Sequence, residues 1–258
     1  MINKYLSDID NIKRFFKEII IDTLIQHTDT LISWSNYTAG IPKKMYSKEY
    51  ENLKYNRQYS FLLKNNGFIQ LFFEFNSTPE LVKAKLAYYP YPIKLKENVE
   101  DLEDYYSTTD DFVLGEYYFD LWNLFQSELG KSSDDEEVKE IKDILDKIGV
   151  SEHEVLEEKF NKKYELTNTS HIRFDFDSKV TSHHKFEIQY ASLNTLRIPL
   201  KQIISPLVFM DFISRHEFPD FYKDLIKNNH YITAYNIALK NSLIINGFKE
   251  NNIYIIHN

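Results

Sequence analysis

The sequence predicts an α+β protein: an antiparallel sheet of about five or six strands, with helices packed on one face and an acidic helical insertion. One observation is a set of β-prone runs bounded by turn residues, at 57–63, 68–75, 81–89, 171–177 and 183–190. A second is the helical spacing of apolar residues near both ends of the chain. The third is charge asymmetry, because residues 97–158 contain 21 Asp or Glu and four Lys, whereas the whole chain has a net charge of −8. Together they indicate a single domain over residues 1–258, with the insertion at about 97–160.

The first predicted element is a long amphipathic helix from about residue 8 to the low thirties. Ser7 and Asp10 resemble a capping box at its start. Behind them Ile9, Ile12 and Phe16 begin an apolar stripe at helical spacing. The following residues, 36–56, are rich in Tyr, Lys and Asn and predict a loop with at most a short helix.

A hairpin and a third strand follow. Asn66-Gly67 lies between two β-prone runs and is a strong hairpin signal. Leu81 to Tyr89 predicts the third strand, which ends at Pro90 because proline has no amide hydrogen for the ladder.

The remaining elements are mostly helical. The acidic region predicts helices at about 112–129 and 131–148 and a short one after a capping box at Ser151. Ser205-Pro206 is a strong helix start. We expect helices at 206–217, 220–228 and 232–245, the last closed by Asn246-Gly247, and an edge strand at 253–257.

Composition and missing patterns exclude several classes of protein. The chain has no Cys, so disulfides, thiolate nucleophiles and Fe–S clusters are excluded. The N-terminus has no apolar signal-peptide core, and the apolar run 19–25 is too short to span a membrane, so we expect a cytoplasmic protein without a membrane partner. Gly130-Lys131-Ser132 lacks the first glycine of a phosphate-binding loop, and His216-Glu217 lacks the second histidine of a zinc protease.

The candidate site is the stretch 171–199, which holds three of the eight histidines and two of the five arginines. Polar residues alternate with apolar ones there, so each strand has one polar face. Folding 171–177 against 183–190 about the loop 178–182 predicts a register in which Phe174 opposes Phe186. On the polar face this register predicts three pairs: Asp177–His183, Asp175–Lys185 and Arg173–Glu187.

Three interpretations of this cluster stay open. Oppositely charged cross-strand pairs stabilise a hairpin without any further role. Alternatively, His171 and His183 exchange protons while Arg173 and Arg197 hold a phosphate. In the third interpretation, carboxylates and histidine bind a divalent metal ion as the cofactor, with the ligands Asp175, Asp177 and His184; because His183 and His184 point to opposite faces, a bulge is needed for both to reach one ion.

Several short motifs resemble an uncharacterised bacterial family that is catalogued only as a domain of unknown function. They are Lys83-Ala-Lys-Leu-Ala-Tyr-Tyr-Pro90, His171-Ile-Arg-Phe-Asp175, Ser182-His-His184, Leu196-Arg-Ile-Pro199 and Ser205-Pro206. The resemblance implies a prokaryotic accessory protein from a mobile-element or phage-defence setting. It implies no activity and no catalytic residues.

The leading functional hypothesis is a bacterial defence or toxin-type protein that acts on nucleic acid or a nucleotide, as a nuclease or phosphodiesterase. In it the catalytic residues are His171, Arg173, Asp175, His183 and Arg197. The competing hypothesis is a non-catalytic protein-interaction subunit of a defence complex, in which the acidic insertion docks a basic partner. A concave pocket around 171–197 would favour chemistry, whereas a flat ladder of pairs would favour a structural role.

Overall fold

The computed structural model describes residues 2–35, 37–38, 46–95, 147, 164–168, 170–182, 184–190 and 197–244. It divides into two compact units, residues 1–91 with 169–258 and residues 92–168. In the second unit the described strands are β7 (Ile93–Leu95) and β8 (Tyr164–Leu166), which pair antiparallel. The helices predicted between 97 and 160 lie outside the described residues, and the single-domain organisation stays a prediction.

The first unit contains a nine-stranded sheet in which every pairing is antiparallel. The path runs β1-β4-β5-β6-β9-β10-β11, while β3 also pairs with β5 and β2 pairs with β3. The strands are β1 Ile20–Thr23, β2 Ile25–His27, β3 Leu31–Trp34, β4 Phe61–Leu63, β5 Phe68–Phe75, β6 Leu81–Tyr89, β9 Ile172–Asp177, β10 Phe186–Tyr190 and β11 Arg197–Pro199. A separate two-stranded ladder joins β12 (Gln202–Ile203) to β13 (Leu243–Ile244). The predicted α+β class and antiparallel sheet are confirmed, with more strands than predicted.

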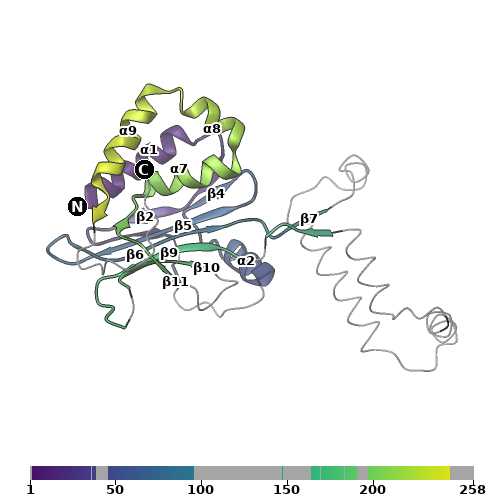
Figure 1. Ribbon diagram of the computed structural model, residues 1–258, viewed down its shortest axis with the longest axis horizontal. Helices are drawn as coiled ribbons and strands as arrows, with labels where there is room; N and C mark the ends of the chain where they lie inside the picture. The colour runs from purple at the N-terminus through teal and green to yellow at the C-terminus, as the bar shows by residue number, and fades with distance from the viewer. Residues whose placement is uncertain are drawn as a thin grey trace. The chain divides into compact units, whose positions relative to one another are not determined.

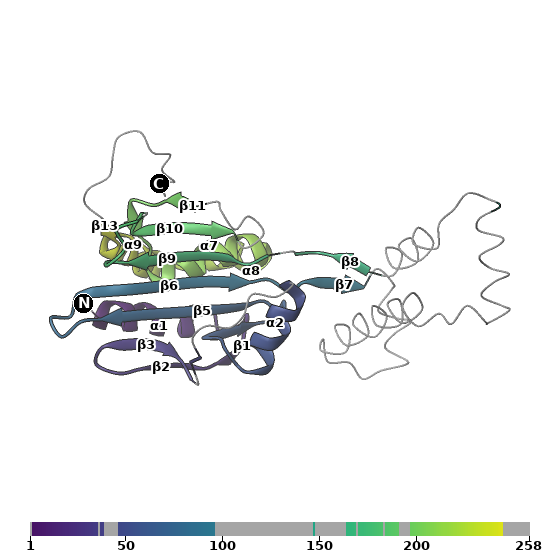
Figure 2. The same cartoon turned by 90° about the horizontal axis from the view of Figure 1, so that it is seen from below.

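Four of the described helices cover one face of this sheet (Figures 1 and 2). They are α1 Ile2–Phe15, α7 Pro206–Glu217, α8 Pro219–Leu225 and α9 Asn229–Asn241. The ring of Tyr5 on α1 lies 4.6 Å from that of Phe73 on β5, and Phe209 on α7 lies 5.5 Å from Phe174 on β9. The main hydrophobic core is therefore between these helices and the sheet.

The fifth described helix, α2 (Tyr46–Tyr55), packs on the opposite face of the sheet. The Tyr50 ring lies 5.2 Å from that of Phe68, and the Tyr46 hydroxyl donates a hydrogen bond to the Pro90 carbonyl at 2.6 Å. The prediction that helices pack on one face therefore holds for the other four described helices. It does not hold for α2, which covers one end of the opposite face.

The prediction of a long N-terminal helix is wrong beyond Phe15, where α1 ends. Residues 20–34 instead form β1, β2 and β3, which account for the additional strands. The run from Ile19 to Ile21 is β-branched, and such residues lose side-chain freedom in a helix and pack well in a sheet. Ser7 is consequently inside α1 and does not cap it.

Predictions that rest on local turn chemistry are confirmed. The hairpin between β4 and β5 turns at Asn66, whose φ of 60° is a left-handed conformation that Asn tolerates. The Ser205 side chain accepts a hydrogen bond from the Val208 amide, with Pro206 in the first turn of α7. Helix α9 begins three residues earlier than predicted, at Asn229, and its predicted end at 245 is wrong, because the helix ends at Asn241 and Leu243–Ile244 form β13. The predicted cap at 246–247 and strand at 253–257 lie outside the described residues. Within the described part of the chain, no helix is both long and apolar enough to cross a membrane.

Candidate site on the polar strand face

The face of the sheet opposite the four helices is polar along β6, β9, β10 and β11. Its residues alternate with the apolar ones that face the helices, as the period of a strand requires. We call these residues the polar strand face: Lys83, Lys85, Arg173, Asp175, Asp177, Lys185, Glu187, Gln189 and Arg197.

The register of β9 and β10 differs from the prediction by two residues. Phe174 pairs with Ile188, not Phe186, and the Asp177 amide donates to the Lys185 carbonyl at 2.9 Å. A shift of two residues keeps every side chain on the same face, so hydrophobic alternation alone cannot select between the two registers. The predicted pairs of Asp175 with Lys185 and of Arg173 with Glu187 are therefore wrong, and His183, the predicted partner of Asp177, lies outside the described residues.

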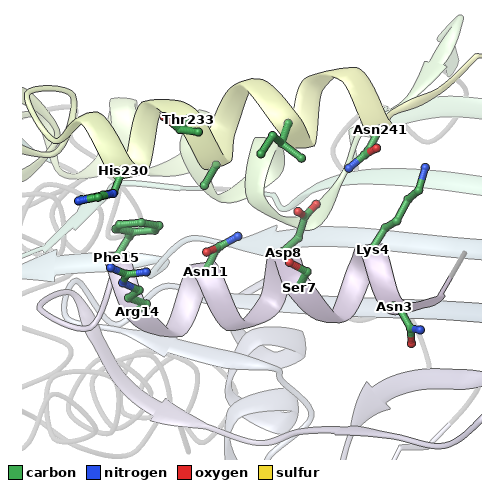
Figure 3. Close-up of a pocket in the computed structure, with 12 residues that line it drawn as sticks. Asn3, Lys4, Ser7, Asp8, Asn11, Arg14, Phe15, His230, Thr233 and Asn241 are labelled. Atoms are coloured by element: carbon green, nitrogen blue, oxygen red, sulfur yellow. The ribbon is translucent and has the colours of Figure 1, made fainter.

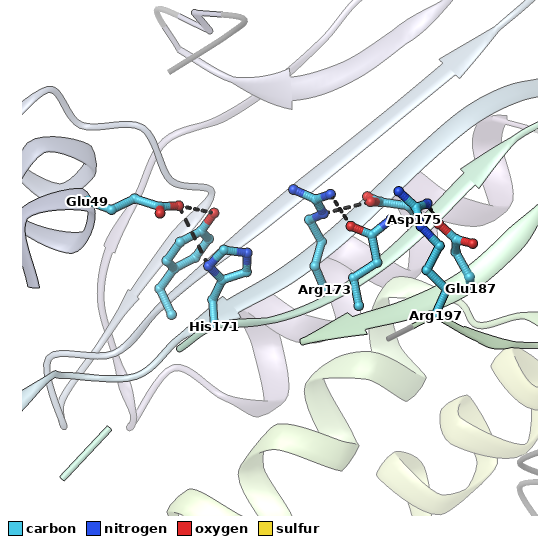
Figure 4. Close-up of polar contacts among 8 residues, drawn as sticks. Glu49, His171, Arg173, Asp175, Glu187 and Arg197 are labelled. Atoms are coloured by element: carbon cyan, nitrogen blue, oxygen red, sulfur yellow. Dashed lines mark hydrogen bonds and ion pairs between the residues drawn. The ribbon is translucent and has the colours of Figure 1, made fainter. Parts of the chain in front are cut away.

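In the observed register two carboxylates lie at opposite positions, because Asp175 pairs with Glu187. Each carboxylate is held by a guanidinium group. Arg173 Nε donates to Asp175 Oδ2 at 2.6 Å, and Arg197 Nη1 donates to Glu187 Oε1 (Figure 4). Gln189 links the two pairs, since it accepts from Arg173 at 2.5 Å and donates to Glu187 at 2.6 Å. The arrangement is a connected network and not a ladder of separate pairs.

Lys85 is the central cation of this face. Its Cα partner across β9 is Asp175, and its side chain is half-buried. Burial, and to a smaller extent the charge of Arg173, lower the pKa of Lys85 from 10.5 to about 8, against the opposing attraction of Asp175 and Glu49. The pKa of Asp175 is raised because its burial outweighs the attraction of Arg173 and Lys85. Both groups have perturbed pKa values, which is common where side chains do chemistry.

A cavity of about 340 Å³ opens over this face. Its charged lining residues are the cations Lys83, Lys85, Lys185 and Arg197 and the carboxylates Asp175, Asp177 and Glu187. The exposed His184 also lines it, and Tyr37 and Phe72 form an aromatic part. The polar strand face is thus hollowed at these lining residues, which is the arrangement expected of a binding site.

The predicted catalytic residues are only partly brought together. Asp175 and Arg197 line the cavity. Arg173 is not among the lining residues but donates a hydrogen bond to Asp175. His171 is 6% exposed and lies elsewhere: its ring stacks on Tyr89 at 4.4 Å, and its Nδ1 is 3.6 Å from Glu49 Oε1 (Figure 4). His183 lies outside the described residues.

The proposed metal ligands Asp175, Asp177 and His184 all line the cavity. Asp177 forms an ion pair with Lys83 at 3.7 Å and accepts from the Lys179 amide at 2.9 Å. Among the described residues no group of three or more His, Asp or Glu side chains is arranged to hold a metal ion. The metal hypothesis therefore gains no geometric support and stays a prediction.

A second cavity, of about 490 Å³, lies between α1 and α9 (Figure 3). Asp8 is among its lining residues and is 5% exposed, and burial raises the pKa of this carboxyl to about 6. Hydrogen bonds from Ser205 and from the Leu207 amide lower that pKa in part, so Asp8 holds the start of α7. The buried Asp8 carboxyl thus has a structural role. None of the predicted site residues lines this cavity.

Sequence reasoning missed Lys85, Glu49, Tyr37 and Phe72. Lys83-Ala84-Lys85 carries the alternation of a half-polar strand, a signal that could have placed Lys85 on one face. Only the pairing of β6 with β9 brings it beside Asp175, and these two strands are far apart in the chain.

Residues 17–255 match the model of a family described as "Uncharacterized conserved protein (DUF2290)". Neither a curated protein nor a solved structure matches the chain.

Proposed function

The chain belongs to the DUF2290 family of uncharacterized conserved proteins, and we propose that it binds the phosphate groups of a nucleotide or nucleic acid on the polar strand face. We further propose that it carries out phosphodiester chemistry there, in a bacterial defence setting. The observation that carries the proposal is the cavity of about 340 Å³, in which Lys85 with a pKa of about 8 lies among further cations.

The phosphate-binding part of the proposal rests on exposed cations at the rim of the cavity. The side chains of Lys83 and Arg197 are 47% and 41% exposed, and Lys185 is exposed as well. Glu187, which is 1% exposed, fixes the guanidinium of Arg197 through Nη1. Arginine in such a fixed position suits recognition of two phosphate oxygens at once.

The chemical part of the proposal rests on Lys85 and Asp175. A lysine whose pKa is about 8 is partly neutral near physiological pH and can accept a proton from an attacking water or hydroxyl group. Asp175, its cross-strand partner, would hold the ammonium form in place. We assign proton transfer to Lys85 in preference to His171, because His171 is not among the residues lining the cavity.

A divalent ion would act with the carboxylates of the same cavity. Mg²⁺ is commonly held by one or two carboxylates while substrate phosphates and water complete its shell. Asp175 and Asp177 are the carboxylates that the metal hypothesis assigns to this role. Dependence of the activity on Mn²⁺ or Mg²⁺ would support this form of the proposal, whereas full activity in EDTA would favour metal-free chemistry.

The experiment measures binding and hydrolysis separately. Binding of a fluorescent nucleotide and of labelled oligonucleotides is compared for wild type and Arg197→Gln. Arg57→Gln is the matched control, because Arg57 is also exposed and paired with a carboxylate, Asp22 at 3.1 Å, at the β1 end of the sheet. We expect only Arg197→Gln to weaken binding.

Hydrolysis of bis(p-nitrophenyl) phosphate and of the bound oligonucleotide is then followed for Lys85→Met. Loss of turnover with retained binding is the result expected. If no phosphate-bearing probe binds the wild type, or if both arginine variants behave alike, the proposal is wrong.

A further inference from the structure

The cavity on the polar strand face has an aromatic part beside its charged part. Tyr37 is 44% exposed and lines the cavity together with Phe72. The two ring centroids are 5.0 Å apart at 33°, so one aromatic surface extends from the sheet into the cavity. A solvent-exposed aromatic ring beside cations is the combination that binds unpaired bases.

Tyr37 is held in position by neighbours that are themselves buried. Its ring packs edge-on against Trp34, 5.1 Å away, and Trp34 is 4% exposed. Gln58 Oε1 accepts hydrogen bonds from Trp34 Nε1 and from the Thr38 amide, both at 3.0 Å. The Trp34 side chain, which contacts the Tyr37 ring, and the Thr38 backbone amide are therefore anchored on the same buried glutamine, so the exposed Tyr37 ring loses little freedom when a planar group stacks on it.

The register connects the aromatic and charged parts. Phe72, Lys85 and Asp175 are successive Cα partners across β5, β6 and β9. Neighbouring strands are ~4.8 Å apart, so the step from Phe72 to Asp175 covers about 10 Å. A nucleotide with its base on the aromatic part therefore places its phosphate near the cations at the other end of the cavity.

We propose that the ligand of this face is a single-stranded nucleic acid, of which one unpaired base stacks on Tyr37 while the adjoining phosphate lies against the cations of the polar strand face. This inference rests on the proposed function. In a duplex the bases are stacked inside the helix and cannot reach Tyr37, so duplex binding would be limited to phosphate contacts. Recognition through the face of a base also predicts little dependence on base sequence.

The test compares oligonucleotides that carry the same number of phosphates. An ordinary single strand, a strand of abasic sites and a duplex are titrated against the wild-type protein by fluorescence anisotropy. We expect the abasic strand to bind roughly 5- to 150-fold more weakly than the ordinary strand, which corresponds to loss of one stacked base. A 2-aminopurine base in the strand should also be quenched on binding.

Variants of the protein give the second arm. Tyr37→Leu should lose the preference for the ordinary strand over the abasic strand, and Tyr37→Phe should retain it. Tyr55→Leu is the control, because Tyr55 is 86% exposed on α2 and does not line the cavity. Circular dichroism establishes that each variant is folded.

The outcomes separate this inference from the proposed function. If ordinary and abasic strands bind equally well and binding still depends on Arg197, the polar strand face binds phosphate but the stacking inference is wrong. Binding of duplex in preference to single strands would also overturn it. If the fluorescent nucleotide binds but none of the oligonucleotides does, the single-strand inference is wrong; if neither binds, the proposed function itself fails.

Discussion

Replacing Lys85 with Met should raise the free energy of unfolding near neutral pH. This gain over wild type should become smaller as the pH rises. In the native protein the pKa of Lys85 is about 8, whereas its usual value is 10.5. Between these two values the unfolded chain binds more protons than the native protein does, so the free energy of unfolding rises with pH across that window. Methionine has a similar length and no charge, so the variant lacks the pH-dependent contribution of Lys85 to the free energy of unfolding.

The magnitude follows from the difference between the two pKa values. It amounts to about 3 kcal/mol of unfavourable free energy at pH 7, where most of the lysine is charged in both states. By pH 9.5 about 2 kcal/mol of that penalty has disappeared, because the native lysine is then neutral. The advantage of Lys85→Met over wild type should therefore shrink by about 2 kcal/mol between pH 7 and pH 9.5.

The assay is urea denaturation of wild type and Lys85→Met at several pH values between 7 and 9.5. Lys179→Met is the control, because Lys179 is exposed in the turn after β9 and should show no such change. A difference between wild type and Lys85→Met that does not vary with pH would refute the argument. The argument would also be refuted if NMR showed that the Lys85 ammonium group titrates near its usual pKa.

Three further predictions concern the scaffold, and each is measured by denaturation. Gly67→Ala should destabilise the protein by roughly 1–3 kcal/mol, because an added Cβ would lie 2.5 Å from the hydroxyl of the buried Tyr88; an unchanged midpoint would contradict this. Asp211→Ala should cost roughly 3 kcal/mol, since this buried carboxylate accepts from Tyr222 and Arg215 at 3.0 Å and from Tyr231; a loss below about 0.5 kcal/mol, as for an ordinary surface residue, would exclude that role. Replacing residues 97–160 with a short Gly/Ser linker should leave the first unit folded, because β7 and β8 pair and bring the ends together. If the first unit then no longer unfolds cooperatively, residues 97–160 are not an insertion.

Local chemistry explains which elements were predictable from the sequence. The turn at Asn66-Gly67 and the start of α7 at Ser205-Pro206 each depend on a few adjacent residues, and both are confirmed. The segment 20–34 was not predictable in the same way, because its apolar spacing also fits a helix. Its strands gain their pairing partners from β4 and β5, which are distant in the sequence.

The site was predictable in its composition but not in its contacts. The alternation in 171–177 correctly places Arg173 and Asp175 on one face. The partners of these residues depend on a register that a two-residue shift changes without moving any side chain to the other face. Lys85 and Tyr37 join the cavity through long-range pairing and loop placement, for which a single sequence carries no direct signal.

The central claim, that the polar strand face binds phosphate, is tested most directly by the salt dependence of oligonucleotide binding. The double variant Lys83→Ala/Lys185→Ala removes two exposed cations from the cavity and leaves the buried network intact. Each phosphate contact with a single strand contributes ~0.7 to the slope of log Kd against log salt concentration, so the slope should fall by about 1.4 in the double variant. An unchanged slope and affinity would contradict the account.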